Sequence, residues 1–181
     1  MATPRPAPEW RVARWLNAPA PIALADLRGK AVLAVAFQML CPGCVAHGLP
    51  QAMRARDTFS EADLAVVGLH TVFEHHEAQG NERALAAFLH EYRIRFPVGM
   101  DDPDPEHAIP ATMRAYRMEG TPTTILIDRQ GNIRLQTFGH LDDMRLGALI
   151  ASLVAEPREP ATASPADTAC GGVGCRPPVS G

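Results

Sequence analysis

Two cysteines separated by a proline and a glycine follow the most apolar short segment of the chain. The segment 31–37 reads Ala-Val-Leu-Ala-Val-Ala-Phe, and Cys41-Pro42-Gly43-Cys44 comes after a short connection. A continuous apolar run of this length is typical of a fully buried β-strand. Pro42 suits the first position of a helix, because its missing N–H would have no partner there. The pattern therefore predicts a strand that leads into a helix with two thiols in its first turn.

The spacing of the two thiols indicates redox chemistry. A helix N-terminus stabilises a thiolate, since its free N–H groups and its partial positive charge face the sulfur. Cys41 occupies that position, and Cys44 lies on the same helix face, from which its sulfur can reach Cys41 and resolve a mixed disulfide. A CxxC pair beside a βαβ pattern favours a redox role. The residues alone leave two alternatives, which are buried thiols without a catalytic role and half of a zinc site.

Length and composition agree with one compact domain in a reducing compartment. The chain has 181 residues, of which 46% are hydrophobic, so it can bury a sizeable core. A formal net charge of −3 and a pI near 6.1 give no electrostatic case for binding nucleic acid or an anionic membrane surface. The longest apolar segment is too short to cross a bilayer, and the first thirty residues hold no signal-like run. Four cysteines are too few for a secreted disulfide scaffold, so we expect a cytoplasmic protein.

Strands and helices alternate along most of the chain. This alternation, followed by a hairpin and a last helix, predicts an α/β fold with a central mixed sheet and helices on both faces. The expected elements after the first strand are a helix over 41–58 with a kink near Gly48 and Pro50, a buried strand over 64–69, a helix over 82–92, an extended piece over 96–99, a short helix over 111–116, a hairpin of strands 123–128 and 133–138, and a helix over 142–155.

The order of these motifs resembles the thioredoxin superfamily. The residues that carry the resemblance are the Cys-x-x-Cys helix, the stretch Gly120-Thr121-Pro122-Thr123 and the hairpin that begins Ile125-Leu126-Ile127-Asp128. Within the superfamily the chain is similar to the TlpA/ResA-like and redoxin (AhpC/TSA-related) branch, which has an insertion between the first helix and the distal hairpin. The match covers roughly residues 22–154. It implies a thioredoxin fold and thiol–disulfide exchange without a cofactor, on a protein or small-molecule disulfide, with an electron donor that the sequence does not identify.

The resemblance also assigns roles to four residues. Cys41 would be the attacking thiol, Cys44 the resolving thiol and Pro122 the cis-proline beside them. A cis bond before Pro122 would turn the backbone of Thr121 towards the active site, where it could pair with an extended substrate. Read from the residues alone, Thr121-Pro122 is a turn before a strand.

Two positions depart from the pattern of the branch. Leu40 stands where its members usually carry a tryptophan, so substrate contacts on that side are expected to differ. His47 stands where the ResA-like group commonly has an acidic residue that assists proton transfer from the buried thiol. A histidine titrates near neutrality, so His47 is a candidate general base for Cys44. The alternative is a solvated helix histidine without a catalytic role.

Composition changes after Ala155, and this change sets the expected domain boundaries. Residues 1–21 form an N-terminal extension, 22–155 a thioredoxin-like domain, and 156–181 a flexible tail rich in Pro, Ala and Gly. The tail carries a second pair, Cys170 and Cys175. Three hypotheses stand for it: a shuttle dithiol that exchanges electrons with the first pair, a clamp for a soft metal, and a dispensable tail.

The loop His70-Thr71-Val72-Phe73-Glu74-His75-His76-Glu77 places three histidines and two carboxylates after a strand. These residues lack the helical spacing of known zinc motifs, so a polar loop on the rim of the active site is the preferred interpretation over a metal site. His140, after the last strand, is interpreted in the same way. No metal is therefore expected in the site.

The leading hypothesis is a thiol–disulfide oxidoreductase that runs as a reductant. A variant is a thiol peroxidase in which Cys41 forms a sulfenic acid. Typical peroxiredoxins carry a threonine three residues before that cysteine and a proline seven before, and Gln38 and Ala34 occupy those places here. The hypothesis from a different class is a soft-metal-binding protein or metallochaperone that uses either cysteine pair.

Overall fold

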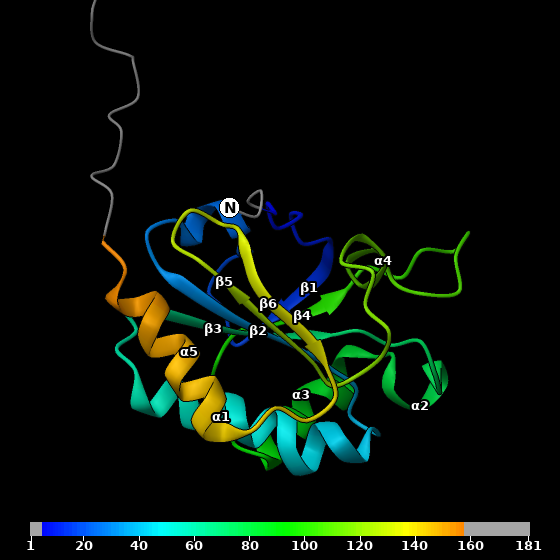
Figure 1. Cartoon of the computed structure of the whole chain (residues 1–181). Coiled ribbons are helices and arrows are strands. Elements are labelled where there is room, and N and C mark those ends of the chain that lie inside the picture. The colour runs from blue at the N-terminus through cyan, green and yellow to red at the C-terminus, as the bar shows by residue number, and fades with distance from the viewer. Residues whose placement is uncertain (1–4, 158–181) are drawn as a thin grey trace, which may run out of the picture.

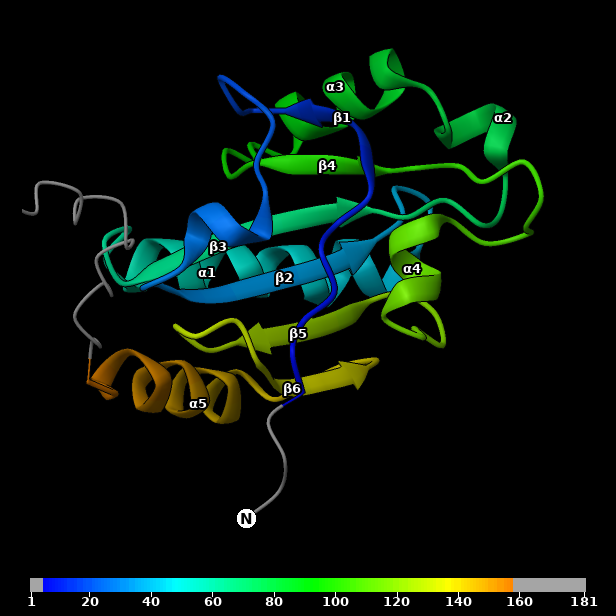
Figure 2. The same ribbon diagram turned by 90° about the horizontal axis from the view of Figure 1, so that it is seen from above.

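A mixed sheet of six strands organises the computed structural model, which describes residues 5–157. The strand order is β1-β4-β3-β2-β5-β6, with β2, β3 and β4 parallel and the other three antiparallel to their neighbours (Figure 2). The strands are β1 (Val12–Leu16), β2 (Ala31–Phe37), β3 (Leu64–His70), β4 (Val98–Asp101), β5 (Thr123–Ile127) and β6 (Ile133–Phe138).

Helices cover both faces of this sheet, as the sequence predicts (Figure 1). α1, α3 and α5 pack on one face, while α4, η1 and the N-terminal segment pack on the other. Their bounds are η1 (Leu24–Leu27), η2 (Cys44–Gly48), α1 (Leu49–Thr58), α2 (His76–Gln79), α3 (Glu82–Glu91), α4 (Ala111–Ala115) and α5 (Asp143–Ala155). Within residues 5–157, the helices are all too short or too polar to span a membrane.

Strand β2 is apolar on both faces because both are covered. Leu33, Val35 and Phe37 belong to the core under α1, α3 and α5, whereas Val32 and Ala34 belong to the core on the opposite face. Every residue of β2 is buried. A central strand between two helical layers gains no benefit from alternation of polar and apolar residues, which explains the continuous apolar run. Cys41 therefore follows the carboxyl end of a buried central strand.

The helix expected over 41–58 changes its winding in the middle. Its first part, η2, is π-helical, and the N–H of Leu49 bonds to the carbonyl of Cys44, five residues earlier. α1 begins at Leu49 with Pro50 in its first turn. Pro50 has no N–H to give to the carbonyl four residues before it, so α-helical bonding fails there. The change falls at Gly48 and Pro50, where the sequence predicts a kink.

Part of the N-terminal extension pairs with the sheet. β1 is an edge strand antiparallel to β4. Trp10 is buried with Tyr116 in the core on the sheet face opposite α1, α3 and α5. The hydroxyl of Tyr116 donates to the carbonyl of Pro8 at 2.7 Å. Residues of this segment thus cover one face of the domain and one edge of its sheet.

Buried Arg129 joins three connections at the end of the sheet opposite the thiols. Its guanidinium donates to the carbonyl of Gly29 (2.6 Å), to the carboxylate of Asp63 (3.1 Å) and to the carbonyl of Val154 (2.7 Å). Arg129 is only 5% exposed. It therefore ties the turn before β2, the connection before β3 and the end of α5 to the end of β5.

We expect Arg129→Met to lower the free energy of unfolding by about 3 kcal/mol, because it removes a buried guanidinium together with its ion pair to Asp63 and its hydrogen bonds to two carbonyls. Chemical denaturation of the reduced protein measures this change. The matched control is Arg134→Met, since the Arg134 guanidinium pairs with Asp128 and Glu156 but is 46% exposed. We expect the control to cost less than about 1 kcal/mol. Equal losses in the two variants would contradict the structural role of Arg129.

Candidate active site

The two cysteines of the CPGC tetrad lie together at the carboxyl edge of β2, where open α/β sheets place their functional groups. Both are free thiols in this structure. The N–H of Cys44 is shared between the carbonyl (3.1 Å) and the sulfur (3.2 Å) of Cys41, and the thiol of Cys41 donates to the carbonyl of Thr121 at 3.4 Å. The helix N-terminus thus offers an N–H to the sulfur of the first cysteine, and this contact would stabilise a thiolate there.

The two thiols differ in their environment. Cys41 is half-buried, whereas Cys44 is fully buried. Burial, together with the hydrogen bond to Cys41, raises the pKa of the Cys44 thiol from 9 to about 12. Cys44 therefore keeps its proton at neutral pH, and Cys41 is the thiol that solvent and a substrate can reach.

Pro122 packs directly against the helix that carries the thiols. The Thr121–Pro122 peptide bond is cis, as the resemblance implies. A Cβ atom at Gly48 would lie 2.9 Å from the Cβ of Pro122, and one at Gly43 would lie 3.3 Å from its Cδ. The two glycines therefore permit an approach that a larger residue at position 48 would block. Thr121, half-buried, lies beside Cys41 through the contact of its carbonyl.

His47 is exposed and its closest aromatic neighbour is His140. The two imidazole centroids are 4.8 Å apart, and the rings are tilted by 52°. Within residues 5–157, neither cysteine shares a hydrogen bond with His47. The structure thus brings His47 and His140 together on the helix side of the site, and the role of His47 as a base stays a prediction.

Exposed apolar side chains lie near the dithiol. Leu40 precedes Cys41 and is 56% exposed, and Phe138 is 53% exposed. Phe138 lies over Gly120, where an added Cβ would come within 2.8 Å of its ring. The next residue, Gly139, donates its N–H to the carbonyl of Pro122 at 2.8 Å. Two exposed apolar side chains thus lie on segments next to Cys41 and Pro122, and Leu40 offers an aliphatic contact where the family usually carries a tryptophan.

The histidines of the loop after β3 do not form one cluster. His70 is the last residue of β3 and is buried, while His75 and His76 are exposed at the start of α2. Burial lowers the pKa of His70 to about 4, so its ring is neutral at pH 7. The part of the chain that the structure describes holds no group of three or more His, Cys, Asp or Glu side chains arranged to bind a metal ion. Cys170 and Cys175 lie outside the described residues.

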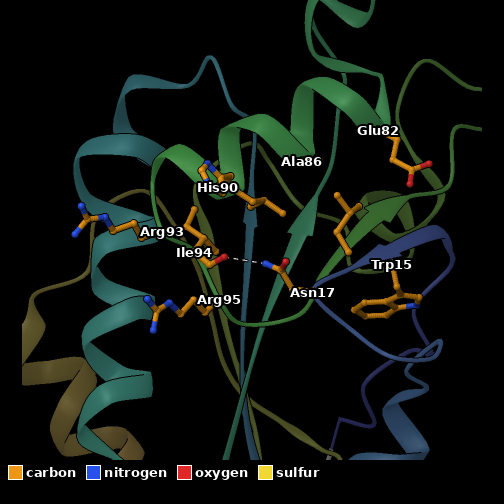
Figure 3. A pocket seen from close by; sticks show the side chains of 10 residues that line it. Trp15, Asn17, Glu82, Ala86, His90, Arg93, Ile94 and Arg95 are labelled. Carbon is orange, nitrogen blue, oxygen red and sulfur yellow. Dashed lines mark hydrogen bonds between the residues drawn. The ribbon is translucent and has the colours of Figure 1, made fainter.

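One pocket of the described residues lies away from the thiols (Figure 3). Its volume is about 840 Å³, and it opens between the end of α3 and β1. Trp15 and Arg93 lie on its wall, and the amide of Asn17 donates across it to the carbonyl of Ile94 at 2.8 Å. Neither cysteine lines this pocket. The dithiol is therefore not part of this pocket.

Comparisons with known proteins place this geometry in a family. Residues 4–136 match the model of the AhpC/TSA family. The crystal structure of a thioredoxin-like superfamily protein is 52% identical, with 86% of this chain and 99% of the other covered and a TM-score of 0.83. A thiol-disulfide isomerase from Corynebacterium glutamicum is 47% identical, with 83% and 98% covered and a TM-score of 0.79.

Other structural relatives are more distant. A protein described as a thiol:disulfide interchange protein DsbE, from Chlorobium tepidum, is 22% identical over 85% of this chain and 99% of the other, with a TM-score of 0.66, and shares the fold. A search of curated proteins gave no match. These findings confirm the resemblance to the thioredoxin superfamily and its redoxin branch, and they confirm the thioredoxin fold.

We expect iodoacetamide at pH 8 to modify Cys41 well before Cys44 in the reduced, folded protein, because only Cys41 is accessible and Cys44 remains protonated. Peptide mass spectrometry locates the modified thiols, and unfolding in guanidinium is the control that exposes both. Equal rates for the two thiols in the folded protein would contradict the asymmetry.

The raised pKa of Cys44 also sets a pH dependence of stability. The folded protein keeps this proton up to about pH 12, whereas the unfolded chain releases it near pH 9. The contribution of Cys44 to stability is therefore fully present below pH 9 and is lost as pH rises towards 12. Cys44→Ala removes this part of the slope, which denaturation of the reduced protein at several pH values measures.

Proposed function

Because the chain belongs to the AhpC/TSA family, we propose that it is a thiol–disulfide oxidoreductase in which Cys41 is the nucleophile and Cys44 the resolving thiol. The observation that carries this proposal is the contrast between the two thiols. Cys41 is accessible and receives an N–H from the helix N-terminus, while Cys44 is buried beside it with its proton retained. A neighbour that is 47% identical is itself named a thiol-disulfide isomerase, which supports the same reaction class.

The proposed reaction has two steps. The Cys41 thiolate attacks one sulfur of a substrate disulfide, an S–S bond forms between Cys41 and the substrate, and the other substrate sulfur leaves as a thiolate. Cys44 then loses its proton and attacks the sulfur of Cys41. The S–S bond between Cys41 and the substrate breaks, and the substrate sulfur that was bonded to Cys41 leaves as a thiolate. The substrate gains two electrons and ends as two thiols, while the protein ends with a Cys41–Cys44 disulfide.

The residues beside Cys41 indicate how a substrate would lie. An extended chain would lie along Thr121, whose backbone is next to Cys41, and its side chains would meet Leu40 and Phe138. We propose protein disulfides with apolar flanking residues as the main substrate class, with small-molecule disulfides as further substrates. In a cytoplasmic setting the protein would act as a reductant that an electron donor recharges. Cys170 and Cys175 would serve as a shuttle dithiol in this cycle.

The peroxidase alternative finds less support in the site. Gln38 and Ala34 occupy the places of the threonine and proline that peroxiredoxins use, and Gln38 directs its side chain to the loop after β3. The family match leaves peroxide reduction as the second candidate, and the experiment below tests it together with metal binding.

A redox titration tests the proposed function. We expect Cys41 and Cys44 to titrate together as one two-electron couple in glutathione buffers, when thiols are trapped by alkylation and located by peptide mass spectrometry. The variant Cys44→Ser should accumulate a mixed disulfide on Cys41, because the resolving step is absent. Thiols that alkylate only after chelation would replace the proposal by metal binding, and faster oxidation of Cys41 by hydrogen peroxide than by disulfides would replace it by peroxidase activity.

We further propose that His47 accepts the proton of Cys44 in the second step, since a thiol with a raised pKa needs a base to react near neutral pH. His47→Ala should slow release of the reduced substrate about tenfold or more and remove the rise of that rate with pH near neutrality. Stopped-flow measurement of the second step at several pH values shows this. The control is His90→Ala, because His90 is an exposed helix histidine on α3. An unchanged pH profile in His47→Ala would leave His47 as a surface residue.

A further inference from the structure

Two buried glutamine side chains join the turn before Cys41 to the loop after β3. Gln38 is 3% exposed and Gln79 is 1% exposed. The side-chain oxygen of Gln38 accepts three hydrogen bonds, from the N–H of Phe73 (3.2 Å), the N–H of Glu74 (3.3 Å) and the side-chain amide of Gln79 (3.0 Å). One atom of the turn is thus held by three donors from a segment that is distant in sequence.

Gln79 holds the other end of the same turn. Its amide nitrogen donates to Gln38 and to the carbonyl of Glu74 (2.8 Å), and its oxygen accepts the N–H of Leu40 at 3.1 Å. The turn itself is closed by the N–H of Cys41, which donates to the carbonyl of Gln38 at 3.2 Å. Gln38 and Leu40, which both belong to this turn, are therefore held by hydrogen bonds to Gln79, a residue outside the turn.

The chemistry of this network requires glutamine at position 79. The side chain must accept one hydrogen bond and donate two, and an amide does both. A glutamate could not donate, and its charge would disfavour a thiolate at Cys41, while a lysine could not accept. An amide therefore orients the turn without adding a charge next to the reacting sulfur.

We propose that Gln79, acting through Gln38 and the Leu40 N–H, is a positioning residue that sets the geometry of Cys41 for disulfide exchange. The inference rests on the proposed function of the dithiol. The contact that depends on this geometry is the one between the N–H of Cys44 and the sulfur of Cys41 (3.2 Å), since it requires the sulfur to stay over the first turn of the helix.

This role accounts for the loop that carries three histidines and two carboxylates. The loop supplies the N–H groups of Phe73 and Glu74 to Gln38, and its short helix α2 ends with Gln79. The loop does border the active site, and its contacts with the site are made by backbone groups and one amide side chain rather than by its histidines.

The test compares Gln79→Met and Gln38→Met with Gln51→Met. Methionine has nearly the same shape as glutamine and makes no comparable hydrogen bonds. Gln51 is the matched control, because it is also buried and its amide donates two hydrogen bonds, to the carbonyl of Leu141 and the carboxylate of Asp143, both at 2.7 Å. The primary readout is the rate of alkylation of Cys41 across pH, which needs no substrate turnover. The melting temperature of each variant reports the purely structural cost.

We expect Gln79→Met to slow Cys41 alkylation at pH 7 roughly tenfold and to move the midpoint of its pH profile upward, because the sulfur loses its alignment with the helix N–H. Gln51→Met should lower the melting temperature by a similar amount and leave the profile unchanged. The double variant of Gln38 and Gln79 should be no slower than the slower single variant, since both act through one network.

Two results would overturn the proposal. One is an unchanged Cys41 profile in Gln79→Met, and the other is the same shift in Gln51→Met, which would make the effect a general loss of stability. Failure of the proposed function looks different. In that case wild-type Cys41 and Cys44 form no internal disulfide in the redox titration, while the alkylation profiles still report whether Gln79 positions Cys41.

Discussion

The contact of the thiol-bearing helix with Pro122 is the interaction on which the site depends. Gly48 lies so close to Pro122 that a Cβ there would approach it to 2.9 Å, and Cys44, four residues before Gly48, is part of the buried core. Burial in turn raises the pKa of Cys44 to about 12 and leaves Cys41 as the reachable thiol. The packing at Gly48 thus accompanies a difference in burial between two cysteines that are only three positions apart in the sequence.

A local pattern predicts most of the fold. β2 and β6 have the expected bounds, and α3, β3 and α5 differ from expectation by one residue at an end, because each carries a clear apolar periodicity or run. The pairing of β1 with the edge of the sheet depends on contacts with β4, more than eighty residues away. The β1 segment is short and mixed in polarity, so its sequence does not predict which strand it pairs with. Local sequence signals element type better than it signals distant pairing.

The site residues likewise fall into those that a local pattern or the family resemblance indicates and those that only distant contacts reveal. The tetrad, with its preceding strand, indicates the two thiols, and the family resemblance indicates Pro122, so these residues meet as expected. No local pattern in the sequence indicates a role for Gln79, which is 41 positions from Gln38 and follows a loop rich in histidines. Glutamine carries no charge and no metal affinity, so only its place in a hydrogen-bond network reveals it. The contact between His47 and His140 likewise joins residues far apart in the sequence, since His140 lies in the connection between β6 and α5.

The side chains that hold the turn before Cys41 are uncharged, and this has an electrostatic reason. A thiolate at Cys41 is stabilised by an N–H of the helix, and a fixed negative charge nearby would oppose it. The turn before Cys41 is held by the amides of Gln38 and Gln79 rather than by an ion pair. His70, at the end of the neighbouring strand, is kept neutral by burial, which lowers its pKa to about 4. Neutral hydrogen-bonding groups thus hold the active-site turn and add no charge of their own beside the first thiol.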